Sequence, residues 1–320
     1  MSILSNDFFF LQEYVDLKFK SSSVIDHEAI SNEFLQLLAK DFSDERFENL
    51  LIHSGYIPDL YPNDSSEETL FTKLVEALVC EWARRMGYTS QLIKEKSSKE
   101  DIKITISGRV IVSDAKSFRL GRSQQAPNAK DFLKLEDIRK WMAWYKNSIG
   151  GLVTYPCTHE WKSDSDIYQY CSTKDAPTVM LPYKYMAYLL HQKGHFNPTD
   201  LLQLWDYNSL FPEKLTKKEK GGNKVKYWQV INSAILNITN TQGDEFVEYM
   251  TRADKIINNC IIAIISKIET TRNAIIKQIK CDISKETDIK KLQTSLMDLQ
   301  IQTLTEQLDT YITRIKNFRL

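Results

Sequence analysis

The chain has 320 residues with 42 basic and 42 acidic side chains, so its formal net charge is zero. That balance excludes proteins that bind nucleic acids through bulk positive charge, and a composition of 26% charged and 42% hydrophobic residues excludes a wholly disordered chain. Ten glycines and eight prolines argue against a turn-rich all-β fold. Five cysteines without a C-x-x-C pair indicate a reduced intracellular protein rather than a disulfide scaffold.

The charges are unevenly distributed along the chain. Residues 1–72 hold four basic and fourteen acidic side chains (net −10), residues 103–146 hold ten and four (net +6), and residues 211–230 hold six and two (net +4). We interpret the two basic stretches as local surfaces for a polyanion. For the second stretch, a solvated loop around Gly221 and Gly222 is the alternative.

The first half of the chain predicts helices and then a hairpin. Short helices are expected over residues 8–60, one of them capped by Asp26, and a longer amphipathic helix over 70–88 should end near Gly87. Residues 102–106 and 109–117 then follow the pattern of strands, and Ser107–Gly108 is a turn dipeptide between them.

The second half returns to mixed patterns and ends in helices. We expect a helix over 133–144, strands over 150–156 and 178–182, and helices over 183–191 and 198–205. From residue 245 onwards two apolar stripes flank a break near 281–284, which predicts a long helical hairpin for packing or for a partner subunit. No apolar segment reaches the roughly 20 residues of a membrane helix, and the N-terminus lacks the pattern of an export signal, so a cytoplasmic location is expected.

The hairpin carries the candidate chemistry. With a two-residue turn at Ser107–Gly108, paired residues sum to 215, so Asp101 lies opposite Asp114, with Cβ atoms roughly 4.5–5.5 Å apart. Two carboxylates so close favour a divalent cation between them, and hard oxygen ligands suit Mg²⁺. Lys116 follows Asp114 by two residues and therefore lies on the same face of the strand, where an ammonium can position water or stabilise charge on a phosphate.

An acid followed by Asp-x-Lys at a strand end is typical of the PD-(D/E)xK nuclease fold. The pattern is weak by itself, because a surface strand with acids and lysines is the commoner explanation. The apolar strand at 110–112, the preceding helix with Glu76 and the basic residues after Lys116 strengthen the nuclease interpretation.

A longer stretch of sequence makes the nuclease interpretation more specific. Residues 114–122 (DAKSFRLGR), followed by Lys130-Asp131-Phe132, resemble the central block of the HindIII type II restriction endonucleases, and the similarity continues at 70–90, 182–190 and 203–220. The resemblance implies a helix-rich α/β fold: a PD-(D/E)xK core with a small mixed sheet flanked by helices, and a C-terminal helical hairpin. We expect an N-terminal helical segment (1–64), a nuclease core with the DNA-binding region (65–230) and a C-terminal helical region for dimerisation (231–320), unless all three form one compact domain.

The family resemblance also implies an activity. It predicts a Mg²⁺-dependent homodimer that cuts both strands of double-stranded DNA at a short palindrome, AAGCTT in the best-known members, with four-base 5′ overhangs and a methyltransferase in the same restriction-modification system. Carried over by position, Asp101, Asp114 and Lys116 are catalytic, and the metal ligands are Asp101, Asp114 and, as a further candidate, Glu76. The sequence leaves open whether Glu100 or Asp101 is the upstream ligand, although the pairing arithmetic favours Asp101.

Several further residues are expected to contact DNA. Arginine can bind guanine in a bidentate manner, Gln124 or Asn128 can serve adenine, and the lysines of 214–226 suit phosphates. The predicted set is Ser117, Arg119, Arg122, Gln124, Asn128, Lys130, Lys217, Lys218 and Lys220.

Two other functions compete with site-specific cleavage. One is a nuclease of the same fold that acts in branch resolution or repair, which would cut branched or mismatched DNA rather than yield discrete fragments. The other is a non-catalytic helical interaction protein in which Asp114-x-Lys116 is accidental, and it predicts no effect of Mg²⁺ on activity or stability.

Overall fold

The computed structural model describes residues 7–21, 24–93, 99–120, 129–156, 161–216, 218–284 and 290–319. The chain forms two compact units, one of Met1–Phe118 with Gln124–Ile256, and a second of Arg119–Ser123 with Ile257–Leu320. The three functional regions expected from the sequence stay predictions.

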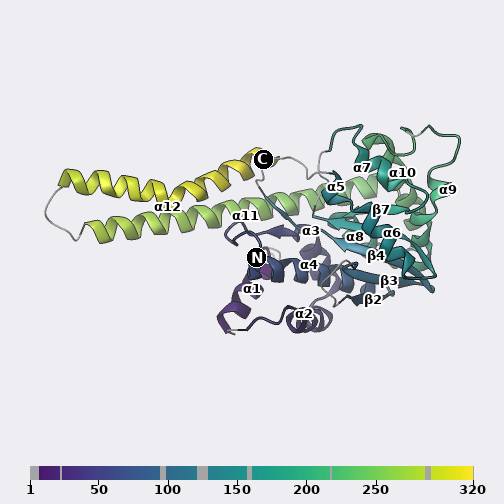
Figure 1. The fold of residues 1–320 in the computed structure, drawn as a ribbon, viewed down its shortest axis with the longest axis horizontal. Coiled ribbons are helices and arrows are strands. Elements are labelled where there is room, and N and C mark those ends of the chain that lie inside the picture. The colour runs from purple at the N-terminus through teal and green to yellow at the C-terminus, as the bar shows by residue number, and fades with distance from the viewer. Residues whose placement is uncertain are drawn as a thin grey trace. The chain divides into compact units, whose positions relative to one another are not determined.

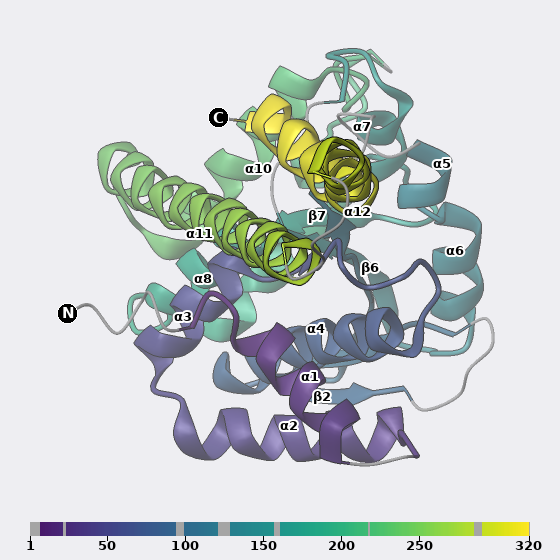
Figure 2. The ribbon, with the colours of Figure 1, turned by 90° about the vertical axis from the view of Figure 1, so that its left-hand side faces the viewer.

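The first unit begins with helices that precede α4 (Ser66–Arg85) in the chain. These are α1 (Phe10–Ser21), α2 (His27–Asp41) and α3 (Asp44–His53), and α1 and α2 both contact α4 (Figure 2). The Asp26 carboxylate caps α2 as predicted, accepting hydrogen bonds from the N–H groups of Glu28 and Ala29 at 3.0 Å. Ser65 caps α4 in the same manner. These caps fix where the helices start.

A five-stranded mixed sheet forms the centre of this unit (Figure 1). Its order is β2 (Thr89–Leu92), β3 (Ile102–Ile106), β4 (Arg109–Ala115), β6 (Ser148–Tyr155) and β7 (Thr178–Pro182). The β2–β3 and β3–β4 pairs are antiparallel, whereas β4–β6 and β6–β7 are parallel. Helices flank the sheet, with α4 against β2, β3 and β4. The predicted helix-rich α/β class and its small mixed sheet are therefore confirmed.

The β3–β4 hairpin has the register that the sequence predicts. Ile106 pairs with Arg109, and the ladder continues to Ile102 opposite Ser113. Ser107 and Gly108 both have positive φ, +47° and +78°, as a type I′ turn requires. The turn therefore sets which residues lie opposite each other at the far end of the hairpin.

The remaining elements up to residue 239 belong to the first unit, except that Arg119 belongs to the second. They are the paired short strands β1 (Tyr56–Ile57) and β5 (Phe118–Arg119), then α5 (Ala129–Phe132), α6 (Leu135–Ala143), α7 (Asp166–Cys171), α8 (Tyr183–His191), the 3₁₀ helix η2 (Pro198–Trp205), α9 (Tyr207–Leu210) and α10 (Lys224–Thr239). The segment 198–205 is thus a 3₁₀ helix, and the second basic stretch runs into α10 rather than remaining a loop throughout.

Two long helices end the chain, α11 (Gly243–Ile283) and α12 (Lys290–Arg319), on either side of the predicted break. Within the second unit they are joined by ion pairs, Arg272 with Asp309 at 2.7 Å and Lys316 with Glu269 at 3.6 Å. The helical hairpin is therefore present. Within the described ranges, no helix has the length and apolarity needed to cross a membrane.

Candidate active site

The end of the β3–β4 hairpin brings Asp101 and Asp114 together. The backbone N–H of Asp101 donates to the carbonyl oxygen of Ser113 at 3.0 Å, so the ladder extends one residue beyond β3. Oδ2 of Asp101 accepts a hydrogen bond from the N–H of Ala115 at 2.9 Å. The carboxylate of Asp101 is therefore held against the last residues of β4, beside Asp114.

Lys116 completes this group and is fixed at its backbone. Its Nζ lies 2.6 Å from Oδ2 of Asp114, and both side chains are largely buried, at 18% and 8% exposed. Its N–H donates to the carbonyl oxygen of Thr154 at 2.8 Å, and its carbonyl oxygen accepts from the hydroxyl of Tyr183 at 2.8 Å. The acid and the ammonium of the Asp-x-Lys pattern thus form a buried ion pair at the edge of the sheet.

Glu76 brings a third carboxylate to this edge from α4. The residue is buried, and burial raises its pKa, although the neighbouring ammonium of Lys73 opposes the rise. For Asp101, burial also raises the pKa well above its ordinary value, and the nearby charges of Glu76 and Asp114 raise it further. The pKa values of Glu76 and Asp101 are thus both raised where carboxylates gather, as expected at a place where an additional cation would lower the free energy.

The donor set suits a hard divalent cation. Besides its ion pair with Lys116, Oδ2 of Asp114 is buried and accepts no hydrogen bond from the described residues. In the described part of the chain, no three His, Cys, Asp or Glu side chains are grouped closely enough to hold a metal by themselves. Mg²⁺ binds through one or two carboxylates completed by water and phosphate oxygens, and Asp101 with Asp114 fits that requirement.

Glu100 faces a different environment from Asp101. It is 2% exposed, one carboxylate oxygen accepts a hydrogen bond from the hydroxyl of Tyr145, and the other has no partner among the described residues. Which of the two residues is the upstream acid stays a prediction, and the pairing arithmetic of the hairpin is what favours Asp101.

The profile described as HindIII restriction endonuclease matches residues 21–300, most of the chain. The chain belongs to the HindIII restriction endonuclease family. A search of curated proteins returned no significant match. Membership of the HindIII family implies a type II restriction endonuclease, a nuclease that acts on DNA, and restriction endonucleases generally use a divalent metal ion.

The predicted DNA-binding residues of this HindIII-family chain are only partly described. Ser117 is half-buried in the first unit, Arg119 is a buried residue of β5 assigned to the second unit, Lys218 is exposed and Lys220 half-buried. The remaining positions lie outside the described residues or side chains: Arg122, Gln124, Asn128, Lys130 and Lys217. Their contacts with DNA stay predictions.

Three residues near the HindIII-family site were not predicted from the sequence. Lys73 binds Glu76 from the preceding turn of α4, a pair that the i, i+3 spacing could have revealed. Tyr183 lies in the predicted helix 183–191, but no local pattern links it to Lys116. Gly55 has φ of +88°, and a Cβ there would come within 2.7 Å of Cε2 of Tyr183, so its missing side chain permits this close approach.

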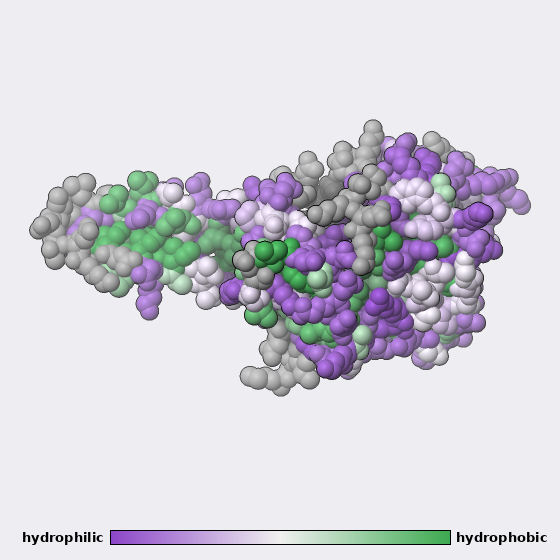
Figure 3. All heavy atoms as spheres, turned by 60° about the horizontal axis from the view of Figure 1, so that its bottom comes forward, coloured by the Kyte–Doolittle hydropathy of each residue, from purple (hydrophilic) through white to green (hydrophobic). Residues whose placement is uncertain are grey.

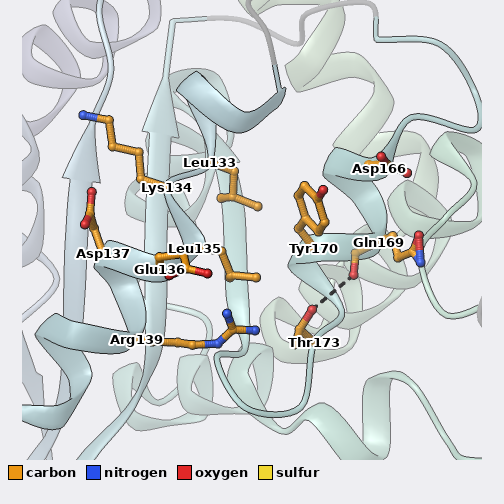
Figure 4. A pocket seen from close by; sticks show the side chains of 10 residues that line it. All are labelled: Leu133, Lys134, Leu135, Glu136, Asp137, Arg139, Asp166, Gln169, Tyr170 and Thr173. Atoms are coloured by element: carbon orange, nitrogen blue, oxygen red, sulfur yellow. Dashed lines mark hydrogen bonds between the residues drawn. The ribbon is translucent and has the colours of Figure 1, made fainter.

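A separate groove lies between α6 and α7 (Figure 4). It has a volume of about 870 Å³ and carries side chains of both signs, including Lys134, Arg139, Glu136 and Asp166. None of the predicted catalytic residues lines it. Mixed charge makes the groove a poor match for a DNA backbone, so the candidate active site remains the hairpin edge.

Proposed function

We propose that the protein is a Mg²⁺-dependent type II restriction endonuclease that hydrolyses one phosphodiester bond in each strand of a short palindrome. Family membership supports the class of enzyme. The observation that carries the site is the buried Asp114–Lys116 ion pair beside Asp101. By resemblance to the best-known family members, the palindrome is AAGCTT, cut after the first A to leave four-base 5′ overhangs.

In this proposal Asp101 and Asp114 hold the metal ion, and Glu76 is a further candidate ligand. When bound, Mg²⁺ supplies Lewis-acid stabilisation of the phosphate and lowers the pKa of bound water. Lys116 orients the attacking water through its ammonium group and opposes the negative charge that develops on the phosphate. Tyr183 and Thr154 fix the backbone of Lys116, so the ammonium extends from a rigid position.

A palindrome requires two equivalent active sites, so we propose a homodimer. The helical hairpin of the second unit is the proposed interface, because α12 carries strongly exposed leucines at Leu296, Leu299 and Leu304. Apolar side chains are visible along this hairpin in Figure 3. We also propose a cytoplasmic location and a cognate methyltransferase, since host DNA must be protected from an active restriction enzyme.

Digestion of phage DNA tests this proposal. With Mg²⁺, the wild-type protein should yield discrete fragments whose sequenced ends give the site and the cut position. Lys116→Ala should abolish cleavage and still bind the same duplex in a gel-shift assay with Ca²⁺. Cleavage by Lys116→Ala at the wild-type rate would refute the mechanism. Cutting confined to branched DNA would instead indicate the resolvase alternative.

A further inference from the structure

Lys73 lies at the acidic cluster but belongs to no recognised catalytic pattern. It precedes Glu76 by one turn of α4, and its Nζ is 2.8 and 2.7 Å from the two carboxylate oxygens of Glu76. The Lys73 side chain is 39% exposed, whereas that of Glu76 is 9% exposed. The ammonium therefore covers the outer side of a carboxylate that is otherwise buried.

The two lysines of the cluster divide its carboxylates between them. Lys116 pairs with Asp114, and Lys73 pairs with Glu76 through both oxygens. In the described part of the chain, Asp101 accepts a backbone hydrogen bond from Ala115 and makes no ion pair. A divalent cation therefore meets no ion-paired ammonium at Asp101, whereas at Glu76 it competes with Lys73 for the oxygen lone pairs.

We propose that Lys73 is a positioning residue that occupies Glu76 in the free protein and transfers its ammonium to a DNA phosphate in the complex. The inference rests on the proposed function, because it requires DNA and a divalent cation at this edge. Lysine is suited to such an exchange, since its ammonium is a mobile point charge on a flexible stem. Once Lys73 leaves, Glu76 can serve the cation, so DNA and metal strengthen each other's binding.

The physical reason for this coupling is charge balance. Glu76, Asp101 and Asp114 carry three negative charges if all ionise, and Lys73 and Lys116 supply two positive charges. A divalent cation added beside both lysines is opposed by their positive charge. A DNA phosphate that attracts the ammonium of Lys73 away from Glu76 lowers this electrostatic repulsion at the proposed metal site.

Calorimetric titration with Ca²⁺ tests the inference, because Ca²⁺ binding is read without any cleavage. Lys73→Met keeps a side chain of similar length without its positive charge. In the absence of DNA, the variant should bind Ca²⁺ roughly tenfold more tightly than the wild type. The reason is that a neighbouring ammonium at this distance shifts the affinity of a carboxylate for a proton by about that factor or more, and it should oppose a metal cation in the same way. Addition of a cognate duplex should then raise Ca²⁺ affinity less in Lys73→Met than in the wild type.

Three further variants serve as controls. Lys140→Met removes a comparable i, i+3 ion pair, with Asp137 on α6 at 3.3 Å, and should bind Ca²⁺ as the wild type does. Lys73→Arg keeps the charge and should also resemble the wild type. Adding Glu76→Gln to Lys73→Met should remove the gain, and circular dichroism of each variant verifies that it is folded.

The outcomes separate this inference from the proposed function. Unchanged or weaker Ca²⁺ binding by folded Lys73→Met, including no detectable binding by either protein, overturns the role of Lys73. Asp114→Asn should lose Ca²⁺ binding in the DNA complex. If it does not, the metal site of the proposed function is wrong, whatever Lys73→Met does.

Discussion

The hydroxyl of Tyr183 donates a hydrogen bond to the backbone carbonyl oxygen of Lys116 at 2.8 Å, across 67 positions of the chain. Tyr183 is the first residue of α8 and is fully buried. Its ring lies so close to Gly55 that no larger residue fits there without displacement. The position of the candidate catalytic lysine thus depends on α8 and on Gly55 before β1, as well as on the end of β4 (Arg109–Ala115).

Replacing Tyr183 with Phe should therefore affect catalysis more than binding. The change leaves the part-buried carbonyl of Lys116 without this donor, which costs about 1–2 kcal/mol, and frees the lysine to move. We expect kcat to fall roughly tenfold with KM little changed. Steady-state kinetics on an oligonucleotide duplex measures both constants. Tyr88→Phe is the matched control, because its hydroxyl donates to the carbonyl of Pro198 at 2.7 Å, and an equal loss of kcat in that variant would contradict the prediction.

Two substitutions should show which of the neighbouring acids, Glu100 or Asp101, is the upstream metal ligand. Asp101→Asn removes a proposed metal ligand and should lower kcat by roughly 10²–10³. It should also leave the melting temperature unchanged or higher at neutral pH, because burial and nearby carboxylates raise the pKa of Asp101 and make its charge costly. Glu100→Gln keeps the hydrogen bond with Tyr145 and should retain cleavage within a few-fold. The reverse order of activities would assign the ligand to Glu100.

Local patterns were sufficient to predict the hairpin that builds the site. The turn at Ser107–Gly108 fixes the register, and the register alone places Asp101 against Asp114. Asp26 and Ser65 likewise set helix starts through a side chain and nearby N–H groups. Such features involve residues close in the chain, so a single sequence contains the information needed to predict them.

Other features of the fold and of the site could not be predicted from local patterns. The edge strand β2 (Thr89–Leu92) has only polar residues in its first three positions, so it lacks the alternation that reveals a strand. The lysines before α10 did not indicate where that helix starts. Periodicity also does not distinguish the 3₁₀ helix η2 from an α-helix. The bond between Tyr183 and Lys116 depends on tertiary packing alone, which no local spacing reports.

Glu48 of α3, away from the candidate active site, should make the stability of the folded protein depend on pH. Burial raises its pKa to about 7, with Asp44 and Glu45 adding to the rise while Arg252 and Lys193 oppose it. Because the folded pKa is raised, the stability associated with protonated Glu48 is fully present below about pH 4.5, its ordinary pKa, and is lost as pH rises through 7.

Glu48→Gln should remove this loss. At pH 8 we expect the variant to be more stable than the wild type by about 1–2 kcal/mol, a value reduced for partial solvent screening, and at pH 5 the two should be nearly equal. His191, whose Nδ1 lies 3.2 Å from a carboxylate oxygen of Glu48, is coupled to its charge, so the same comparison is made in a His191→Gln background. Urea unfolding at the two pH values measures the difference, and a constant difference across this range would show that Glu48 does not titrate there.

The apolar side chains of α12 differ in exposure between the two ends of the helix. Towards its C-terminal end Leu308, Ile312 and Ile315 are buried, whereas Leu296 and Leu299, nearer its start, are each 60% exposed. Exposed leucines on consecutive turns of one helix are costly in water unless another surface covers them. In a homodimer, a second copy of this chain would cover them.

The double variant Leu296→Glu with Leu299→Glu should therefore dissociate the proposed dimer. Because both side chains are already exposed, each protomer should remain folded, and charges facing each other across a two-fold axis would repel. Analytical ultracentrifugation at micromolar concentration should show a dimer for the wild type and a monomer for the variant, with loss of double-strand cleavage. Leu17→Glu on α1, also 60% exposed in the wild type, should remain dimeric. A stable dimer of the double variant would place the interface elsewhere on the protein.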